Sequence, residues 1–238
     1  MKKKIFMLLA AMVLMLTACN KTEAVITKET EKATEAEAEE AVKKAETALE
    51  ETEDALEEAE AAEEFTKGEL TAEGWESKWL GIRYMAPSDT AMATEEELNS
   101  MMGLGQEVLS EDFNDLQLQY AELTTVYEMM CMSQDQVTNI MVTIEKLPIA
   151  MDIDTYISSF EKTLSRVSAM TYTVVGSDEV IKLGERKFTR VKCVADYNGV
   201  EIYQDYCIAI VEDRAVSVTV TYLDEVAAEN ILSGFEAY

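Results

Sequence analysis

The sequence predicts an α+β fold, in which an antiparallel sheet is flanked by helices as a sandwich. Hydrophobic residues make up 48% of the 238-residue chain, which is enough for a globular core. Beyond residue 70, short runs of alternating apolar and polar residues recur between turn-forming residues, a pattern typical of β-strands. Two apolar stripes at helical spacing interrupt and end this series. Hairpins with helices between and after them are typical of the α+β class.

The first half of the predicted domain begins with a hairpin or bent strand from Trp75 to Met85, which ends at Pro87. Thr94 is a good N-cap, and the three glutamates after it suit the positive end of a helix dipole. We expect this helix to break at Gly103-Leu104-Gly105, because glycine is a poor helix former. Two strands are predicted next, joined by the polar residues 133–136, at Thr125–Met132 and Asn139–Leu147.

The second half contains a helix, a series of strands and a last helix. The segment Asp152–Val167 carries its apolar residues on one helical face, with Asp152 or Asp154 as the cap. The last helix is predicted to run from Asp224 through Phe235. Between the two helices the sequence predicts five strands: Tyr172–Val175, Glu179–Leu183, Arg186–Tyr197, Val200–Val211 and Ala215–Tyr222.

The dipeptide Asn198-Gly199 fixes the pairing of the two longest predicted strands, because it favours a two-residue type I′ turn. The numbers of opposite residues then sum to 397, so Cys193 faces Gln204 and Cys207 faces Arg190. One face of this hairpin is apolar and holds Val191, Cys193, Ala195, Ile202, Tyr206 and Ile208.

The other face of the hairpin carries Lys192 opposite Asp205, which predicts a cross-strand ion pair. Cys193 and Cys207 point to opposite sides of the sheet, so we expect both to stay reduced, with Cys193 in the core. Neither has a histidine or a helix N-terminus beside it to lower its pKa, so neither is expected to be a catalytic thiolate.

Three segments of the domain carry a family resemblance. They are Trp79-Leu80-Gly81-Ile82-Arg83-Tyr84 with Pro87, Lys182-Leu183-Gly184 before the long strands, and Thr221-Tyr222 leading to Ile231-Leu232-Ser233-Gly234-Phe235. Over about 160 residues this pattern resembles the PsbP-like domains, which include a photosystem II extrinsic subunit, a yeast nuclear-import cofactor and many small bacterial lipoproteins. The resemblance implies an antiparallel sheet flanked by helices, and an accessory or binding role without catalysis.

Residues 1–18 are predicted to be a lipoprotein signal peptide. Three lysines at positions 2–4 precede an apolar run from Ile5 to Leu16, which is too short to span a bilayer. The segment closes with Leu16-Thr17-Ala18-Cys19, which resembles the lipobox of bacterial lipoproteins. In that family the cysteine receives a diacylglycerol and becomes the first mature residue, so the resemblance makes Cys19 the lipidation site and the membrane anchor. An ordinary secretory signal or an uncleaved anchor is the alternative.

Residues 19–69 are predicted to hold the lipidated cysteine and an acidic stalk, helical or disordered. Residues 20–70 contain 18 acidic and 6 basic residues, and Thr27 to Glu64 contains no glycine, proline or aromatic residue. Glutamate, alanine and lysine favour a single charged helix or a semi-rigid spacer. A weak heptad pattern leaves a coiled-coil oligomer as an alternative, and the oligomeric state stays open. The pattern is carried by Val42, Ala45, Leu49, Thr52, Leu56 and Ala59.

The charge of the chain excludes some partners and favours others. Its 47 acidic and 20 basic residues give a formal net charge of −27, which argues against nucleic acid, since a nucleic-acid surface needs clustered Lys and Arg. The domain's own net charge of −18 over residues 71–238 favours a basic protein or a cationic small molecule. The chain contains no histidine, which removes every Ser-His, Cys-His and His-ligated metal arrangement.

No motif predicts a catalytic, cofactor or metal site. Gly103-Leu104-Gly105 lacks the third glycine of a dinucleotide loop. The methionine clusters, 101–102 and 129–132 with Cys131, offer soft metal ligands, but successive strand residues point to opposite faces, so core packing is the preferred interpretation. The aromatic residues near the start of the domain are assigned to the core: Trp75, Trp79 and Tyr84. Two pairs of aspartates are assigned to helix caps or solvated faces: Asp112 with Asp115, and Asp152 with Asp154.

These observations predict a lipid-anchored, extracytoplasmic binding or accessory protein of the bacterial cell surface, without catalysis. Two alternatives stay open. One is an enzyme of cell-wall or lipid metabolism that works with carboxylates alone, for which two acidic residues would have to converge in a deep pocket. The other is an oligomerising surface spacer.

Overall fold

The computed structural model describes residues 64–110, 112–197 and 199–238. The predicted signal peptide, the lipidation site Cys19 and the stalk up to residue 63 lie outside the described residues. The segment Thr66–Tyr238 belongs to one compact unit. Within the described segments, no helix is long and apolar enough to cross a bilayer.

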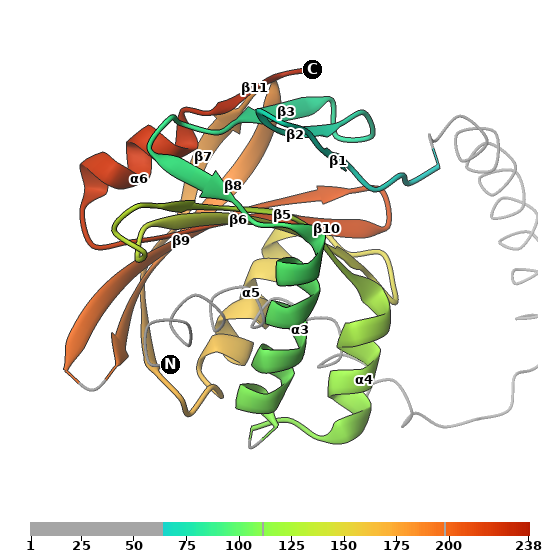
Figure 1. Ribbon diagram of the computed structural model, residues 1–238. Coiled ribbons are helices and arrows are strands. Elements are labelled where there is room, and N and C mark those ends of the chain that lie inside the picture. The colour runs from blue at the N-terminus through green and yellow to red at the C-terminus, as the bar shows by residue number, and fades with distance from the viewer. Residues whose placement is uncertain (1–63, 111, 198) are drawn as a thin grey trace, which may run out of the picture. The chain divides into compact units, whose positions relative to one another are not determined.

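A seven-stranded antiparallel sheet separates two packed layers in this unit (Figure 1). In spatial order its strands are β4 (Thr90–Met92), β5 (Thr125–Ser133), β6 (Asn139–Lys146), β10 (Arg214–Tyr222), β9 (Val200–Val211), β8 (Arg186–Tyr197) and β7 (Thr171–Leu183). One side carries α3 (Glu95–Leu109), α4 (Asp115–Thr124) and α5 (Ile153–Leu164). The other side carries α6 (Glu225–Leu232) and a small sheet of β1 (Glu69–Leu70), β2 (Gly74–Ser77), β3 (Ile82–Met85) and β11 (Phe235–Ala237). The predicted α+β class is confirmed.

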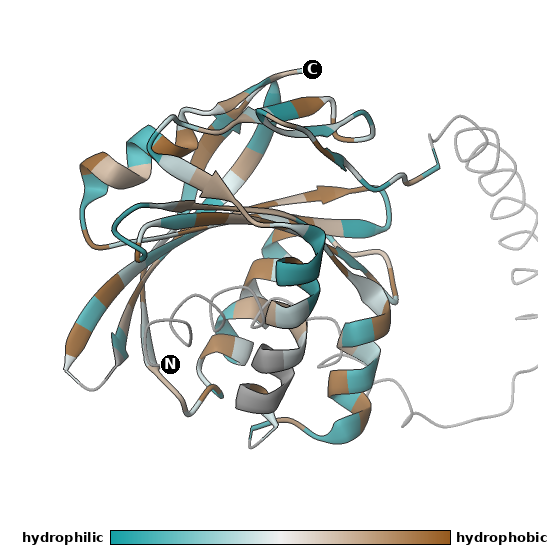
Figure 2. Ribbon diagram, viewed as in Figure 1, coloured by the Kyte–Doolittle hydropathy of each residue, from teal (hydrophilic) through white to brown (hydrophobic). Residues whose placement is uncertain are grey.

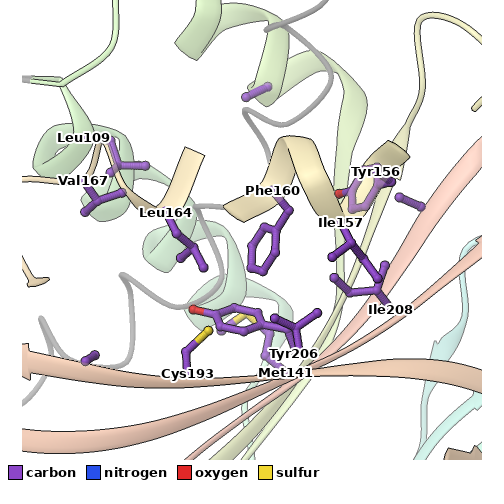
Figure 3. Close-up of a cluster of buried hydrophobic side chains, with 14 of the residues drawn as sticks. Leu109, Met141, Tyr156, Ile157, Phe160, Leu164, Val167, Cys193, Tyr206 and Ile208 are labelled. Atoms are coloured by element: carbon purple, nitrogen blue, oxygen red, sulfur yellow. The ribbon is translucent and has the colours of Figure 1, made fainter. Parts of the chain in front are cut away.

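The core between the sheet and its three helices forms around α5. Asp152, one of the two caps that the sequence allows, caps this helix by accepting a 2.7 Å hydrogen bond from the Thr155 amide. The apolar stripe of α5 faces the sheet, and the ring of Phe160 packs edge-on against Tyr206 with 4.7 Å between centroids (Figure 3). Cys193 lies beside this pair in the same cluster. The predicted core position of Cys193 is therefore confirmed.

Helix α3 begins as predicted but does not break. Thr94 and Glu97 form a reciprocal capping box at its start. The predicted break at Gly103-Leu104-Gly105 is wrong, because α3 continues to Leu109. A glycine costs a helix about 1 kcal/mol relative to alanine, whereas burying a leucine contributes roughly 1.5–3 kcal/mol. Leu98 and Leu109, on either side of the glycines, are both buried in the core, so packing outweighs propensity.

The β8–β9 hairpin has the predicted register. Tyr197 pairs with Val200, Cys193 with Gln204 and Cys207 with Arg190. Hydropathy alternates along the two strands, as Figure 2 shows. The face of the hairpin that carries Asp205 is nevertheless not exposed to solvent. Cys207 and Asp205 are buried there, because the sheet is covered on both sides.

Other boundaries differ from the prediction in ways that tertiary contacts explain. The two strands predicted at 172–175 and 179–183 are one strand, β7, with register shifts between Val174 and Glu179. Phe235, predicted as the end of the last helix, belongs to β11 instead. The chain leaves α6 at Gly234, whose carbonyl accepts a 2.8 Å bond from the Met85 amide and so leads into pairing with β3. Helix α4 and the short strands β1 and β4 had no predicted counterpart.

Candidate binding site

A hollow of about 540 Å³ opens where β7–β10 meet the start of α6. This volume lies within the range of ligand-binding pockets. Strands β7 and β8 and the β10–α6 connection supply its rim, and β9 supplies part of its floor. The hollow is lined by Val175, Lys192, Cys193, Tyr203, Asp205, Tyr222, Leu223, Asp224 and Glu225.

Asp205, which lines this hollow, belongs to a buried ion pair with Arg190. Nε and Nη2 of Arg190 both donate to Oδ2 of Asp205, the Nε contact being 2.8 Å. The hydroxyl of Tyr222 donates to the other carboxylate oxygen at 3.2 Å. Arg190 is 5% exposed and Asp205 1% exposed. The Asp205 carboxylate is therefore neutralised and held in place by strong charge-assisted hydrogen bonds.

Two further carboxylates reach the same guanidinium from the surface. Glu179 of β7 lies 3.8 Å from Arg190 Nη1, and Glu229 of α6 lies 3.5 Å from Nη2. Glu179 also binds Lys192 at 3.3 Å. Both basic side chains of this region are thus already bound to carboxylates, which leaves the negative charges of the rim in excess.

A pair of tyrosines forms one wall of the hollow. Tyr203 and Tyr222 are directly opposite on β9 and β10, and their rings stack with 5.6 Å between centroids and 22° between planes. Burial, and then the nearby Asp205 carboxylate, raise the pKa of Tyr222 well above its usual value, so its hydroxyl stays a donor at neutral pH. Tyr203 is exposed and presents a ring face of the kind that attracts cations.

The predicted ion pair on this face has the right strand positions but the wrong partner. Lys192 is opposite Asp205, as predicted, yet Asp205 pairs with Arg190 and Lys192 pairs with Glu179. Arginine is the better partner in a buried site, because its planar guanidinium matches a carboxylate and is more weakly hydrated than an ammonium.

The sequence carries part of the signal for this site, but does not predict it. The predicted register already places Arg190 and Asp205 on one face of the hairpin, at diagonal positions two residue pairs apart. Extending the register to β10 would have placed Tyr222 opposite Tyr203. What the sequence did not show is that α6 covers this face.

The aromatic and aspartate residues singled out in the sequence have structural roles. Trp75, Trp79 and Tyr84 are buried, as predicted. Asp112 accepts a 2.9 Å hydrogen bond from the Ser168 amide and so joins the α3–α4 connection to the segment after α5. Asp115 lies in the first turn of α4. Over the described residues, no group of three or more Asp, Glu or Cys side chains is arranged to hold a metal ion.

Cys193 and Cys207 are both free and buried. Burial raises the pKa of each thiol to about 12, so neither forms a thiolate at neutral pH. We expect protein purified without oxidant to contain both as thiols, which react with an alkylating reagent only after unfolding. Mass spectrometry of the non-reduced protein tests this, and a Cys193–Cys207 crosslinked peptide would contradict the register.

Glu128 is a second buried acidic residue, at a β-bulge in β5 between Tyr127 and Met129. Its Oε2 accepts hydrogen bonds from the Gly68 amide at 2.7 Å and from Nε1 of Trp75 at 3.2 Å. Oε1 is buried, and no described residue hydrogen-bonds to it. Burial raises the pKa of Glu128, against the opposing effect of these two hydrogen bonds and of Lys67. The residue fastens β1 and β2 to the large sheet.

Glu128→Gln is expected to stabilise the protein more at pH 8 than at pH 4. The folded-state pKa of Glu128 is raised, so its contribution to stability is full below the unfolded pKa of about 4.3 and is lost as the pH rises through the folded value. Glutamine keeps an acceptor for Gly68 and Trp75 without the buried charge. Thermal unfolding of both proteins across this range gives the difference.

The matched control is Glu122→Gln, on the exposed face of α4. The difference in melting temperature between this variant and the wild type should change little between pH 4 and pH 8. If the melting-temperature difference for Glu128→Gln were also the same at pH 4 and pH 8, Glu128 would not change its protonation between these conditions. Its burial would then not raise its pKa as described.

Comparisons with known proteins give structural neighbours only. No protein-family model matches the sequence, and no curated protein matches it. The solution structure of the cyanobacterial PsbP protein (CyanoP) of Synechocystis sp. PCC 6803 is 7% identical, with a TM-score of 0.45, and the match covers 73% of this chain and 98% of that one. LpqN, described as involved in cell envelope biogenesis of Mycobacterium tuberculosis, is 11% identical with a TM-score of 0.36, over 65% of this chain and 82% of that one. These values carry no statement about function.

Proposed function

We propose that this chain is a lipid-anchored, extracytoplasmic binding or accessory protein of the bacterial cell surface, without catalysis, and that the hollow above Asp205 seats a basic side chain of a protein partner. One observation carries the proposal. A stacked tyrosine pair and an acidic rim surround a floor whose own charges are already paired.

The rim favours a cation for two reasons. Asp224 and Glu225 line the opening, whereas its one lysine, Lys192, is held by Glu179. A lysine or arginine over the Tyr203 ring would gain a cation–π contact of about 0.5–1 kcal/mol at such an exposed site. The net charge of the domain attracts a basic partner at longer range.

Apolar side chains beside the hollow suit a protein rather than an isolated ion. Val175, Leu223 and Val226 are each more than half exposed, and the first two line the opening. Interfaces combine such apolar contacts with a charged rim. A partner segment with a basic residue flanked by apolar ones fits this surface.

The carboxylate-dependent enzyme is the weaker interpretation, because each buried carboxylate holds a structural partner. Asp205 binds Arg190, Glu128 binds Trp75, and Glu145 accepts a 2.8 Å hydrogen bond from the Tyr156 hydroxyl. Acid–base work by a carboxylate pair needs two groups that face one substrate. Within the described residues, these groups serve different parts of the core.

Titration with a short peptide of alternating arginine and glycine tests the pocket. The full chain, with its tyrosine rings labelled with ¹³C, should show shifts of the Tyr203 and Tyr222 resonances with this peptide, and none with a glutamate–glycine peptide. Glu225→Gln should weaken the affinity for the peptide, measured from these shifts, roughly two- to fivefold, as expected for one exposed charge. Glu122→Gln should leave the affinity unchanged. These two rings staying unmoved would remove the pocket as the binding site. The Glu122 control separates the pocket from the acidic surface elsewhere on the folded domain.

Cys19→Ala tests the anchor. The variant should accumulate either as an uncleaved membrane protein or as released protein, since the acyl chains proposed for Cys19 are absent. Fractionation of cells, followed by mass spectrometry of the N-terminus, distinguishes the outcomes. A variant that is cleaved normally, acylated and membrane-bound would contradict the lipobox interpretation.

A further inference from the structure

A second hollow, of about 480 Å³, lies at the β4 edge of the large sheet, beside α3. It is separate from the hollow above Asp205, and the two share no lining residue. Its lining is rich in methionine: Thr90, Ala91, Met92, Ala93, Glu97, Met101, Met130, Met132, Ser133, Gln134 and Gln136.

Three of these methionines come from two elements that pack together. Met130 and Met132 are two residues apart on β5, so their side chains leave the same face of the sheet. Met130 is fully buried, whereas Met132 is half-buried and lies opposite Ala91, whose small side chain leaves room beside it. Met101, on α3, and Met132 both pack against the cluster that contains Met130.

Only methionines that are adjacent along a strand point to opposite faces of the sheet. Met129 and Cys131 do point to the other face, where Cys131 donates to the Thr90 hydroxyl at 3.0 Å. The alternate residues Met130 and Met132 are not separated in this way. Met130 and Met132 therefore extend from the same face of β5, and Met101 of α3 lines the same hollow.

The chemistry of this donor set is specific. Thioethers are soft, neutral ligands that select monovalent copper over hard cations such as Ca²⁺. Glu97 lies one helical turn before Met101 and lines the same hollow, so a carboxylate stands near the donors. Its oxygen Oε2 accepts from the Thr94 amide at 2.9 Å, and a carboxylate oxygen suits hard cations better than Cu(I).

We propose that Met101, Met130 and Met132 bind Cu(I), with their three thioether sulfurs as ligands. The site is independent of the proposed pocket for a basic partner and uses none of its residues. Binding needs no oxidation or reduction when the metal arrives as Cu(I). Because thioethers carry no proton at any ordinary pH, binding by them releases none.

Silver(I) is the redox-inert probe for this site. The full chain, labelled with ¹³C at its methionine methyl groups, is titrated with Ag(I) and separately with Cu(I) under exclusion of oxygen. The methyl resonances of Met101, Met130 and Met132 should shift together at one equivalent, and Ca²⁺ should not move them. The same shifts at pH 5.5 and pH 7 would fit thioether ligands and would not fit thiolate ligands.

The paired variants Met101→Leu with Met132→Leu should weaken Ag(I) binding at Met130 by at least tenfold, about the loss that follows from disturbing a metal site. Leucine is close in volume to methionine, so the fold should tolerate the change, and thermal unfolding checks this. The control pair, Met85→Leu with Met151→Leu, removes two half-buried methionines that do not line the hollow. Equal affinity in the two paired variants, or Ag(I) binding that leaves these three methyl groups unmoved, would overturn the proposal.

Discussion

Arg190→Leu is expected to lower the free energy of unfolding by about 3–5 kcal/mol, because it leaves the Asp205 carboxylate buried without its partner. For a domain of this size, that loss lowers the melting temperature by on the order of 10 °C. Among the described residues, the remaining donor to Asp205 is the Tyr222 hydroxyl, and one neutral hydrogen bond does not replace a guanidinium. Thermal or urea unfolding at neutral pH measures the effect.

Arg83→Leu is the matched control. Arg83 also donates through Nε and Nη2 to a single carboxylate oxygen, that of Glu236, but both side chains are more than 40% exposed. An exposed pair of this kind contributes little to stability, because water and salt screen the two charges. Replacing Asp205 together with Arg190 by leucine should recover much of the loss, since no buried charge is then left alone. Equal losses for Arg190→Leu and Arg83→Leu would show that Asp205 is not isolated from water as its burial implies.

Gly74→Ala is expected to be the second severe substitution, with a loss of about 3 kcal/mol or more. A Cβ at Gly74 would stand 1.8 Å from the carbonyl oxygen of Tyr84 and 2.9 Å from the carbonyl carbon. These are backbone atoms of the neighbouring strand, so no side-chain rotation relieves the clash. The β2–β3 pairing that holds Trp75 opposite Tyr84 would have to open.

Gly103→Ala provides the contrast. Gly103 lies inside α3, is exposed, and has open space where its Cβ would stand. Alanine is the better helix former by about 0.8–1 kcal/mol, so this variant should be more stable than the wild type. Urea unfolding of both glycine variants tests the assignment. A stabilising Gly74→Ala or a strongly destabilising Gly103→Ala would contradict the packing described here.

Sequence patterns predicted the elements whose cause is local. The dipeptide Asn198-Gly199 predicted the pairing of β8 with β9 correctly. Thr94 marked the start of α3, and the choice of Asp152 or Asp154 marked the start of α5. The errors occur where distant contacts decide. The pairing of β11 with β3 converts Phe235 from a helical to a strand residue, and core packing carries α3 through two glycines.

The candidate site was less predictable than the fold for the same reason. The register placed Arg190, Lys192 and Asp205 on one face, but choosing between the two basic residues requires knowing that the face is buried. The methionine hollow likewise depends on α3 lying beside β5, which no local pattern indicates. Turn and face patterns identify neighbours within a sheet, whereas burial and convergence come from the layers that cover it.

The central claim is that the hollow above Asp205 contacts a basic protein partner at the cell surface. It is tested most directly by a photocrosslinking amino acid at Leu223, on the rim of the hollow, with the same amino acid at Leu123 on α4 as control. Both side chains are exposed, and they lie on different layers of the fold. In intact cells we predict one reproducible crosslinked product from position 223, to a basic protein, that is lost at high ionic strength and in a Tyr203→Ala background. The same products from both positions, or none from position 223, would contradict the claim.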